Sequence, residues 1–330
     1  MSAGVKYCLG VGVLLALLLF MSLFVGPVSV PSTDVLRILT GHQADNESWS
    51  FIILRSRLPQ SATAMLCGAS LAVSGLMLQT TFRNPLAGPD IFGINSGAAL
   101  AVALVMLSPW GFMHGSASLL TAAFVGAIAV MSIIFLFARH VRNSAMLLIV
   151  GIMIGFVASS VVSLLNFFAT EGGLRAFVMW GMGNFDGVSV QQMPLFVGVS
   201  VAGLIASLLL IKPLNAFLLG AYYAENLGVD TRRLRNILLL ITGLLTAVAT
   251  AYCGPVSFLG LAVPHLARFL LSKTDHRQLL PITMLCGAAI ALLCNVLCHL
   301  PISGGVIPLN AVTPLVGAPV IIYVIARKRI

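Results

Sequence analysis

The chain of 330 residues has 18 Lys and Arg against 9 Asp and Glu, a net charge of +9, yet only 8% of its residues are charged. A soluble domain carries about 25% charged residues, so this composition excludes a water-soluble globular protein. No basic cluster lies beside an aromatic platform, which argues against a nucleic-acid partner. We expect an all-α integral membrane protein that forms a single domain over residues 1–330 and contacts the lipid bilayer.

Long apolar runs repeat along the chain, and about 20 apolar residues span the hydrocarbon layer as a helix. The first run is long and lacks a small-x-small cleavage site, which indicates a retained helix and not a signal peptide. Two runs are short, as in helices that stop inside the protein. The sequence predicts ten crossings, at 5–26, 57–80, 94–108, 116–138, 144–168, 190–211, 235–252, 256–271, 279–299 and 310–326.

The positions of the basic residues predict the orientation. With the N-terminus inside, fourteen of the 18 Lys and Arg are cytoplasmic, and those left outside are Arg37, Arg55, Arg57 and Arg175. Short cytoplasmic loops of membrane proteins carry an excess of Lys and Arg. An even number of crossings returns the C-terminus to the inside, so we expect both termini in the cytoplasm.

The cytoplasmic loop over residues 212–235 is longer than a tight turn requires. Residues 221–227 have the pattern of a short amphipathic helix that ends at Gly228. A helix on the cytoplasmic face is a natural docking element for a soluble partner, and an ordinary surface helix is the equal alternative.

Glycine and proline interrupt the apolar pattern at residues 84–89 and again at 254–264. Proline removes a helix donor and glycine permits close backbone approach. Within a membrane, irregular backbone persists only where protein or a water-filled cavity satisfies it. Two such interruptions in the two halves of the chain predict a repeated architecture around a pathway, with ordinary kinks as the alternative.

Motifs of ATPases and enzymes are missing. The chain has no Gly-Lys dipeptide, hence no GxxxxGK[ST] phosphate loop, and no HExxH or GxSxG motif. In the predicted topology almost no acidic residue lies within the membrane, which argues against an ion-coupled carrier. Cys294, Cys298 and His299 could share a helix face and hold a soft metal. Since no fourth ligand is evident, we expect neither a metal site nor another cofactor.

Several segments carry a resemblance that covers nearly the whole chain: NPLAGPDIFGI within residues 68–99, ENLGVDTRRLR at 225–235, GPVSFLGLAVPHLAR at 254–268 and TPLVGAP at 313–319. They resemble the FecCD-type permeases, the membrane subunits of bacterial ABC importers. The resemblance implies ten helices per subunit, a homodimer with a central pathway, two cytoplasmic ATPase subunits, an external substrate-binding protein and a place in the cell inner membrane. The implied cargo is a bulky metal chelate, iron-siderophore or haem, with vitamin B12 (cobalamin) as the alternative and an ion-coupled secondary transporter as a remoter one.

The resemblance also implies roles for particular residues. Those matching the ATPase-coupling helices are Gly220, Ala221, Tyr222, Glu225, Asn226, Leu227 and Gly228. Those matching the cytoplasmic gates are Asn84, Leu86, Asn143 and Ser144. Arg57 matches an external arginine that meets the binding protein, and Gln60 and His299 lie on the same docking surface. The chain departs from the family pattern at Gln60, Asn295, His299 and 306–310, where charged residues are usual, so the docking contacts stay open.

Overall fold

The computed structural model describes residues 3–42, 44, 46–107, 116–141, 144–300 and 305–327. These residues form helices joined by short loops, and no strand occurs among them, which confirms the all-α prediction. In chain order the elements are α1 (Ala3–Phe24), α2 (Ser32–Leu39), α3 (Glu47–Ile52), the π-helical turn η1 (Ile53–Arg57), α4 (Leu58–Phe82), the 3₁₀ turn η2 (Pro89–Phe92), α5 (Ile94–Met106), α6 (Ser116–His140), α7 (Ser144–Phe168), α8 (Glu171–Gly181), α9 (Met193–Leu209), α10 (Ile211–Leu218), α11 (Ala221–Asn226), α12 (Thr231–Cys253), α13 (Leu259–Leu271), α14 (His276–Cys298) and α15 (Leu309–Arg327).

Within the described residues, six helices are long and apolar enough to cross a membrane, or seven if α9 and α10, which meet at a 52° bend, form one span. Three shorter apolar helices, α5, α13 and α15, lie where the sequence predicts the other crossings. A multi-pass membrane protein is therefore supported, while the number of ten crossings stays a prediction. The short lengths of α5 and α13 agree with the prediction of helices that stop inside the protein.

Some helices were not expected from the apolar pattern. The elements α3 and η1 continue directly into α4, so this helix begins at Glu47 and not near residue 57. The amphipathic helices α8 and α10 also lie in segments that the sequence left as loops. Polar side chains stabilise the N-terminal ends of α3 and α8. Asn46 accepts a hydrogen bond from the backbone N–H of Ser48 at 2.9 Å, and Thr170 accepts one from the backbone N–H of Gly173 at 3.3 Å.

Helix α4 is the centre of the bundle, because 83% of its apolar stretch is buried against 17% in α1. It packs on α12, α13 and α14, and glycines bring the backbones into contact. A Cβ atom on Gly68 would lie 2.3 Å from the carbonyl oxygen of Gly287 in α14. One on Gly75 would lie 1.6 Å from the carbonyl oxygen of Gly260 in α13. Small residues allow membrane helices to approach this closely, so side-chain volume at these points decides whether the bundle closes.

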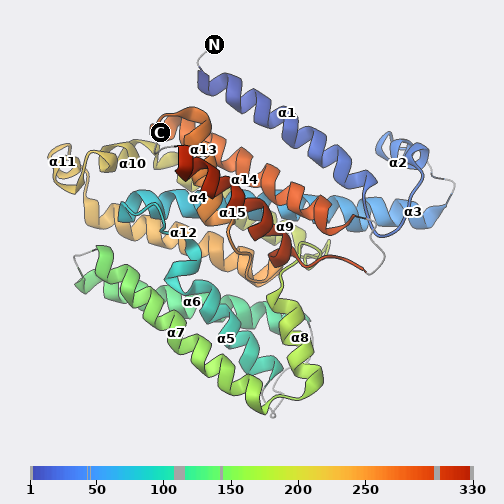
Figure 1. Cartoon of the computed structure of the whole chain (residues 1–330), viewed down its shortest axis with the longest axis horizontal. Helices are drawn as coiled ribbons and strands as arrows, with labels where there is room; N and C mark the ends of the chain where they lie inside the picture. The colour runs from blue at the N-terminus through green and yellow to red at the C-terminus, as the bar shows by residue number, and fades with distance from the viewer. Residues whose placement is uncertain are drawn as a thin grey trace.

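The short helices lie at opposite ends of the molecule. Figure 1 shows α10 and α11 at the left and α2 and α3 at the right, with the long helices between them. Helix α1 begins and α15 ends on the side of α10 and α11 (Figure 1). This arrangement agrees with two termini on one side of the membrane, and the identity of that side as cytoplasmic stays a prediction.

Candidate functional site

The two Gly/Pro interruptions, one between α4 and α5 and the other between α12 and α13, lie against each other. The backbone N–H of Phe258 donates to the Asp90 carboxylate. In the same junction, Nε2 of His265 lies 2.8 Å from the carbonyl oxygen of Pro85. Protein groups thus satisfy backbone atoms that a regular helix would have paired, as irregular segments within a membrane require. The sequence predicted two related interruptions, and the structure brings them together.

A polar network crosses this junction. The Asp90 carboxylate accepts a hydrogen bond from the side-chain amide of Asn95, whose oxygen accepts from the Thr250 hydroxyl at 2.6 Å. Phe258 has a φ of 70°, a conformation that costs on the order of 1–3 kcal/mol in a non-glycine residue. Its bond to Asp90 helps to offset this strain. Sequence reasoning placed Asp90 only in an inner loop and missed the network, because it joins residues far apart in the chain, such as Asn95 and Thr250, which are 155 positions apart.

The gate residues of the first interruption form a tight turn after α4. The side-chain oxygen of Asn84 accepts from the backbone N–H of Leu86 at 2.9 Å, and its carbonyl accepts from Ala87 at 3.0 Å. This turn presents the Leu86 side chain, which is 56% exposed. Of the second pair, Asn143 lies outside the described residues and Ser144 is the first residue of α7. The gate roles stay predictions.

The expected short helix after α10 is present as α11. Gly220 precedes it with a φ of 117° and Gly228 follows it with a φ of 83°, values that favour glycine. The Glu225 carboxylate accepts from the Thr231 hydroxyl at 2.6 Å, which anchors α11 to the start of α12. The helix and the residue after it expose three large side chains, Tyr222, Tyr223 and Leu227. Such a surface fits a docking element, a role that stays a prediction.

Arg57 occupies a different environment from the expected one. It is 3% exposed, and its guanidinium donates to the carbonyl oxygens of Leu23 at 2.6 Å, Phe24 at 3.1 Å and Val28 at 2.5 Å. These bonds hold the end of α1 and the following turn against the start of α4. In this conformation Arg57 faces the chain's own carbonyls, so its docking role stays a prediction. The other arginines that the predicted topology places outside are Arg37, Arg55 and Arg175, and their side chains are exposed.

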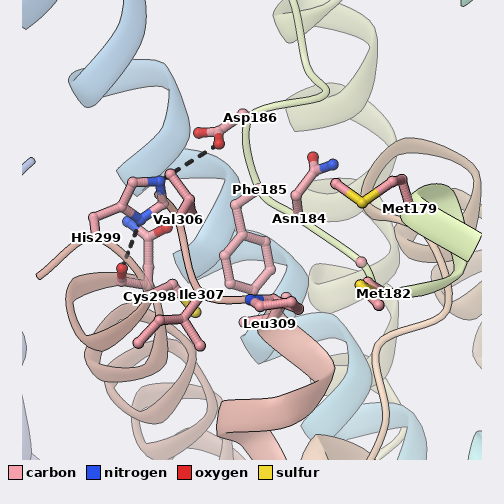
Figure 2. A pocket seen from close by; sticks show the side chains of 13 residues that line it. Met179, Met182, Asn184, Phe185, Asp186, Cys298, His299, Val306, Ile307 and Leu309 are labelled. Atoms are coloured by element: carbon pink, nitrogen blue, oxygen red, sulfur yellow. Dashed lines mark hydrogen bonds and ion pairs between the residues drawn. The ribbon is translucent and has the colours of Figure 1, made fainter. Parts of the chain in front are cut away.

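The residues at which the chain departs from the family pattern converge at one place. The amide nitrogen of Gln60 lies 3.0 Å from Asn295 Oδ1 and 2.9 Å from His299 Nε2. The same imidazole nitrogen lies 3.5 Å from the Asp186 carboxylate. A cavity of about 190 Å³ opens beside them, with His299 and Cys298 on one side and two methionines on the other (Figure 2). The apolar part of its lining includes Met179, Met182, Phe185, Val306, Ile307 and Leu309.

His299 is one of the titratable groups that line this cavity, together with Asp186 and Cys298. Burial lowers the pKa of His299, but hydrogen bonds to Asp186 and to the carbonyl of Asn295 outweigh burial and hold that pKa above its ordinary value. Cys294 and Cys298 are buried, and no three His, Cys, Asp or Glu side chains in the described part of the chain are grouped to hold a metal ion. The alternative of a metal site at Cys294, Cys298 and His299 therefore has no geometric support.

The fold and these sites define a multi-pass α-helical membrane protein with paired helix interruptions at its centre. The model of the FecCD transport family matches residues 14–327. The vitamin B12 import system permease protein BtuC of Klebsiella pneumoniae subsp. pneumoniae is 33% identical over 98% of this chain and 94% of its own length, and that of Salmonella typhi is 36% identical over 82% of each chain. The chain belongs to the FecCD transport family and is a transport permease subunit, which confirms the resemblance found in the sequence.

Solved structures agree with this assignment. A metal-chelate type ABC transporter in an inward-facing conformation matches with a TM-score of 0.86 and 31% identity, over 98% of this chain and 99% of the other. A PsaBC complex from Streptococcus pneumoniae matches with a TM-score of 0.54 and 15% identity, a likeness of fold alone.

Proposed function

We propose that this chain is the permease subunit of an ATP-driven importer that moves a bulky metal chelate, an iron-siderophore or haem, across the cell inner membrane. Two copies form a homodimer around a central pathway, two cytoplasmic ATPase subunits bind its inner face, and an external binding protein delivers the cargo. The chain itself hydrolyses no ATP. The observation that carries this proposal is the agreement, over nearly the full length, with a metal-chelate type ABC transporter.

Vitamin B12 is the second candidate cargo. The relatives in Klebsiella and Salmonella are named as vitamin B12 permeases, at 33–36% identity. Cobalamin, haem and ferric siderophores are all large metal chelates, so the same wide and weakly binding path serves any of them. Weak binding matters because a cargo held tightly in the path would not be released.

Alternating access follows from the proposed architecture. Closure of the ATPase pair moves α11, and this movement reaches the inner interruption that carries Asn84 and Leu86. The gate at Asn143 and Ser144 opens and closes out of phase with it. The Leu86 side chain is exposed in the single subunit and closes the path by apolar contact with its counterpart in the second subunit.

Uptake into proteoliposomes tests the proposal. The permease is reconstituted with its ATPase and binding protein, and uptake of haem, cobalamin and a ferric siderophore is measured with enclosed ATP. We expect uptake of one of them, and loss of that uptake with a hydrolysis-deficient ATPase as the matched control. Uptake driven by an ion gradient without the ATPase would refute the proposal and support a secondary carrier.

A further inference from the structure

We propose that Asn215, His276 and Thr80 form a hydrogen-bonded bridge that couples the movement of α11 to the inner gate turn after α4. The inference rests on the proposed function and adds positioning residues to it. The three side chains come from α10, α14 and α4. Helix α10 is separated from α11 by two residues, and Thr80 is four residues before Asn84. The bridge thus joins the docking helix to the turn that presents Leu86.

Asn215 begins the bridge, and its amide orientation follows from its partners. The amide nitrogen donates to Asp275 Oδ1 at 2.6 Å, and the amide oxygen accepts from the backbone N–H of His276 at 2.9 Å. A carboxylate only accepts and a backbone N–H only donates, so the opposite orientation would break both bonds. The hydrogen bond from the Arg277 backbone N–H and, next to it, the one from the Asn215 amide hold the pKa of Asp275 below its ordinary value. Asp275 therefore stays a charged acceptor at neutral pH.

His276 continues the bridge inside the bundle. It is 0% exposed, and its Nδ1 lies 2.9 Å from the same Asn215 oxygen. Because that oxygen accepts, Nδ1 carries a hydrogen, and in the neutral imidazole Nε2 is then an acceptor. The Thr80 hydroxyl lies 3.0 Å from Nε2 and 2.9 Å from the carbonyl oxygen of Leu76 in its own helix. Since Nε2 only accepts in this tautomer, the single hydroxyl hydrogen that joins the two groups comes from Thr80, and it completes the connection to the last turn of α4. Each polar atom of the imidazole thus has a partner on another helix.

A second contact joins the start of α11 to the turn after α4. Arg83, the residue directly after α4, has a φ of 48°, and its guanidinium lies against Gly220 at the start of α11. A Cβ atom on Gly220 would lie 2.8 Å from Arg83 Nη2, the flexible end of that side chain, and it is the φ of 117° that favours glycine at this position. The start of α11 and the turn after α4 are therefore held together on two sides. A movement of α11 that keeps these contacts carries the gate turn with it.

Thr80 offers a sharp test, because Thr81 beside it is a matched control. Both side chains are buried, and Thr81 donates to the carbonyl of Met77 in its own helix at 2.7 Å, with no bond to another helix in the described structure. Valine keeps the shape of threonine without the hydroxyl. The three variants are therefore Thr80→Val, which removes the bridge, Thr81→Val, which leaves it, and Thr80→Ser, which keeps the hydroxyl.

A cysteine at the gate turn reports the coupling. Leu86→Cys is introduced with Cys8→Ala, since the other native cysteines are buried and Cys8 is half-buried. In the permease–ATPase complex, the rate of labelling with a membrane-impermeant maleimide is compared without nucleotide and with ATP and vanadate. We expect the nucleotide-dependent change in rate to fall about fivefold in Thr80→Val, the effect of one buried hydrogen bond on an equilibrium. Thr81→Val and Thr80→Ser should keep the change, and each variant should retain the bound ATPase.

The outcomes separate the bridge from the function on which it rests. The reference is the complex that carries only Leu86→Cys and Cys8→Ala. If its labelling rate changes with nucleotide and changes equally in Thr80→Val, the bridge is overturned and the proposed function stands. Equal losses in Thr80→Val and Thr81→Val would also overturn it, because they would reflect packing. A reference complex that binds no ATPase or ignores nucleotide would overturn both. Asn215→Ala, which removes the bonds at the other end, should reproduce the Thr80→Val loss.

Discussion

Replacing Gly75 by alanine tests whether backbone contact between α4 and α13 holds the bundle together. The new Cβ atom would lie 1.6 Å from the carbonyl oxygen of Gly260 and 2.5 Å from its carbonyl carbon. Ordinary van der Waals contact needs roughly twice the shorter distance, so the helices must part by about 1.5 Å. Overpacking costs about 1–3 kcal/mol, and the opposing atom here is backbone that cannot rotate away. We therefore expect Gly75→Ala to lower the free energy of unfolding by about 3 kcal/mol, the upper end of this range.

Unfolding of the purified chain in mixed micelles with rising SDS, followed by circular dichroism, measures this loss. Gly198→Ala on α9 is the matched control, because no described atom lies within 4 Å of its added Cβ. That substitution should be neutral or stabilising by up to about 1 kcal/mol, since alanine favours a helix over glycine. Equal stabilities of the two variants would show that α4 and α13 do not depend on this contact.

Three further predictions follow from the described contacts. Arg57→Gln removes the charged donors that bind carbonyls at the end of α1 and in the following turn, and it should lower the free energy of unfolding by about 2–3 kcal/mol in the same assay. Arg55→Gln is the control. An equal small loss of stability in both variants would show that the bonds of Arg57 do not hold this turn. Because the pKa of His299 is raised, its ion pair with Asp186 stabilises the folded state below a pH of about 6.5, and this stabilisation is lost as the pH rises through the raised pKa. The melting temperature should therefore fall more between pH 5.5 and pH 8 in the wild type than in Asp186→Asn. The difference corresponds to less than about 1 kcal/mol because Asp186 is half-exposed. Parallel pH profiles of the two proteins would show that the pair does not stabilise the fold. Deleting residues 221–227 should abolish co-purification of the ATPase and leave the melting temperature of the bundle unchanged, and recovery of the ATPase with the deleted chain would remove the docking role from α11.

Much of the fold can be predicted from the sequence because the membrane imposes long apolar helices. The helices α12 and α14 lie where apolar runs predict them, and α11 lies between the glycines that punctuate its ends. The helix that begins at Glu47 extends beyond its prediction, because Arg55 and Arg57 separate the short apolar run at residues 51–54 from the long apolar run that follows. Helices α8 and α10 were missed for a related reason: they have 11 and 8 residues and are amphipathic, which an apolar span pattern does not detect.

The sites are less accessible from sequence, because their contacts join distant residues. Gln60 and Asn295 are 235 positions apart, and each alone reads as an ordinary polar residue near a helix end. Arg57 was expected to face a partner, and only the structure shows that carbonyls after α1 surround it. His276 carried no signal at all in the sequence, since a histidine at a helix start gives no indication of the helices that it will contact. Family resemblance located the gate turn and α11 but could not supply the bridge between them.

The contacts around the turn after α4 divide the subunit into a fixed and a peripheral part. The close approach of Gly75 to Gly260 holds α4 on α13, and the bond from His265 to Pro85 ties α13 to the gate turn. The bridge through His276 ties the same turn to α14 and α10. The turn is therefore held from two sides within its own subunit and has little freedom to open alone. In the proposed dimer, the inner gate must then open by separation of the two subunits' cores, while α1, α6 and α7 bury few of their residues within the subunit and form its peripheral part, which meets lipid or the second subunit.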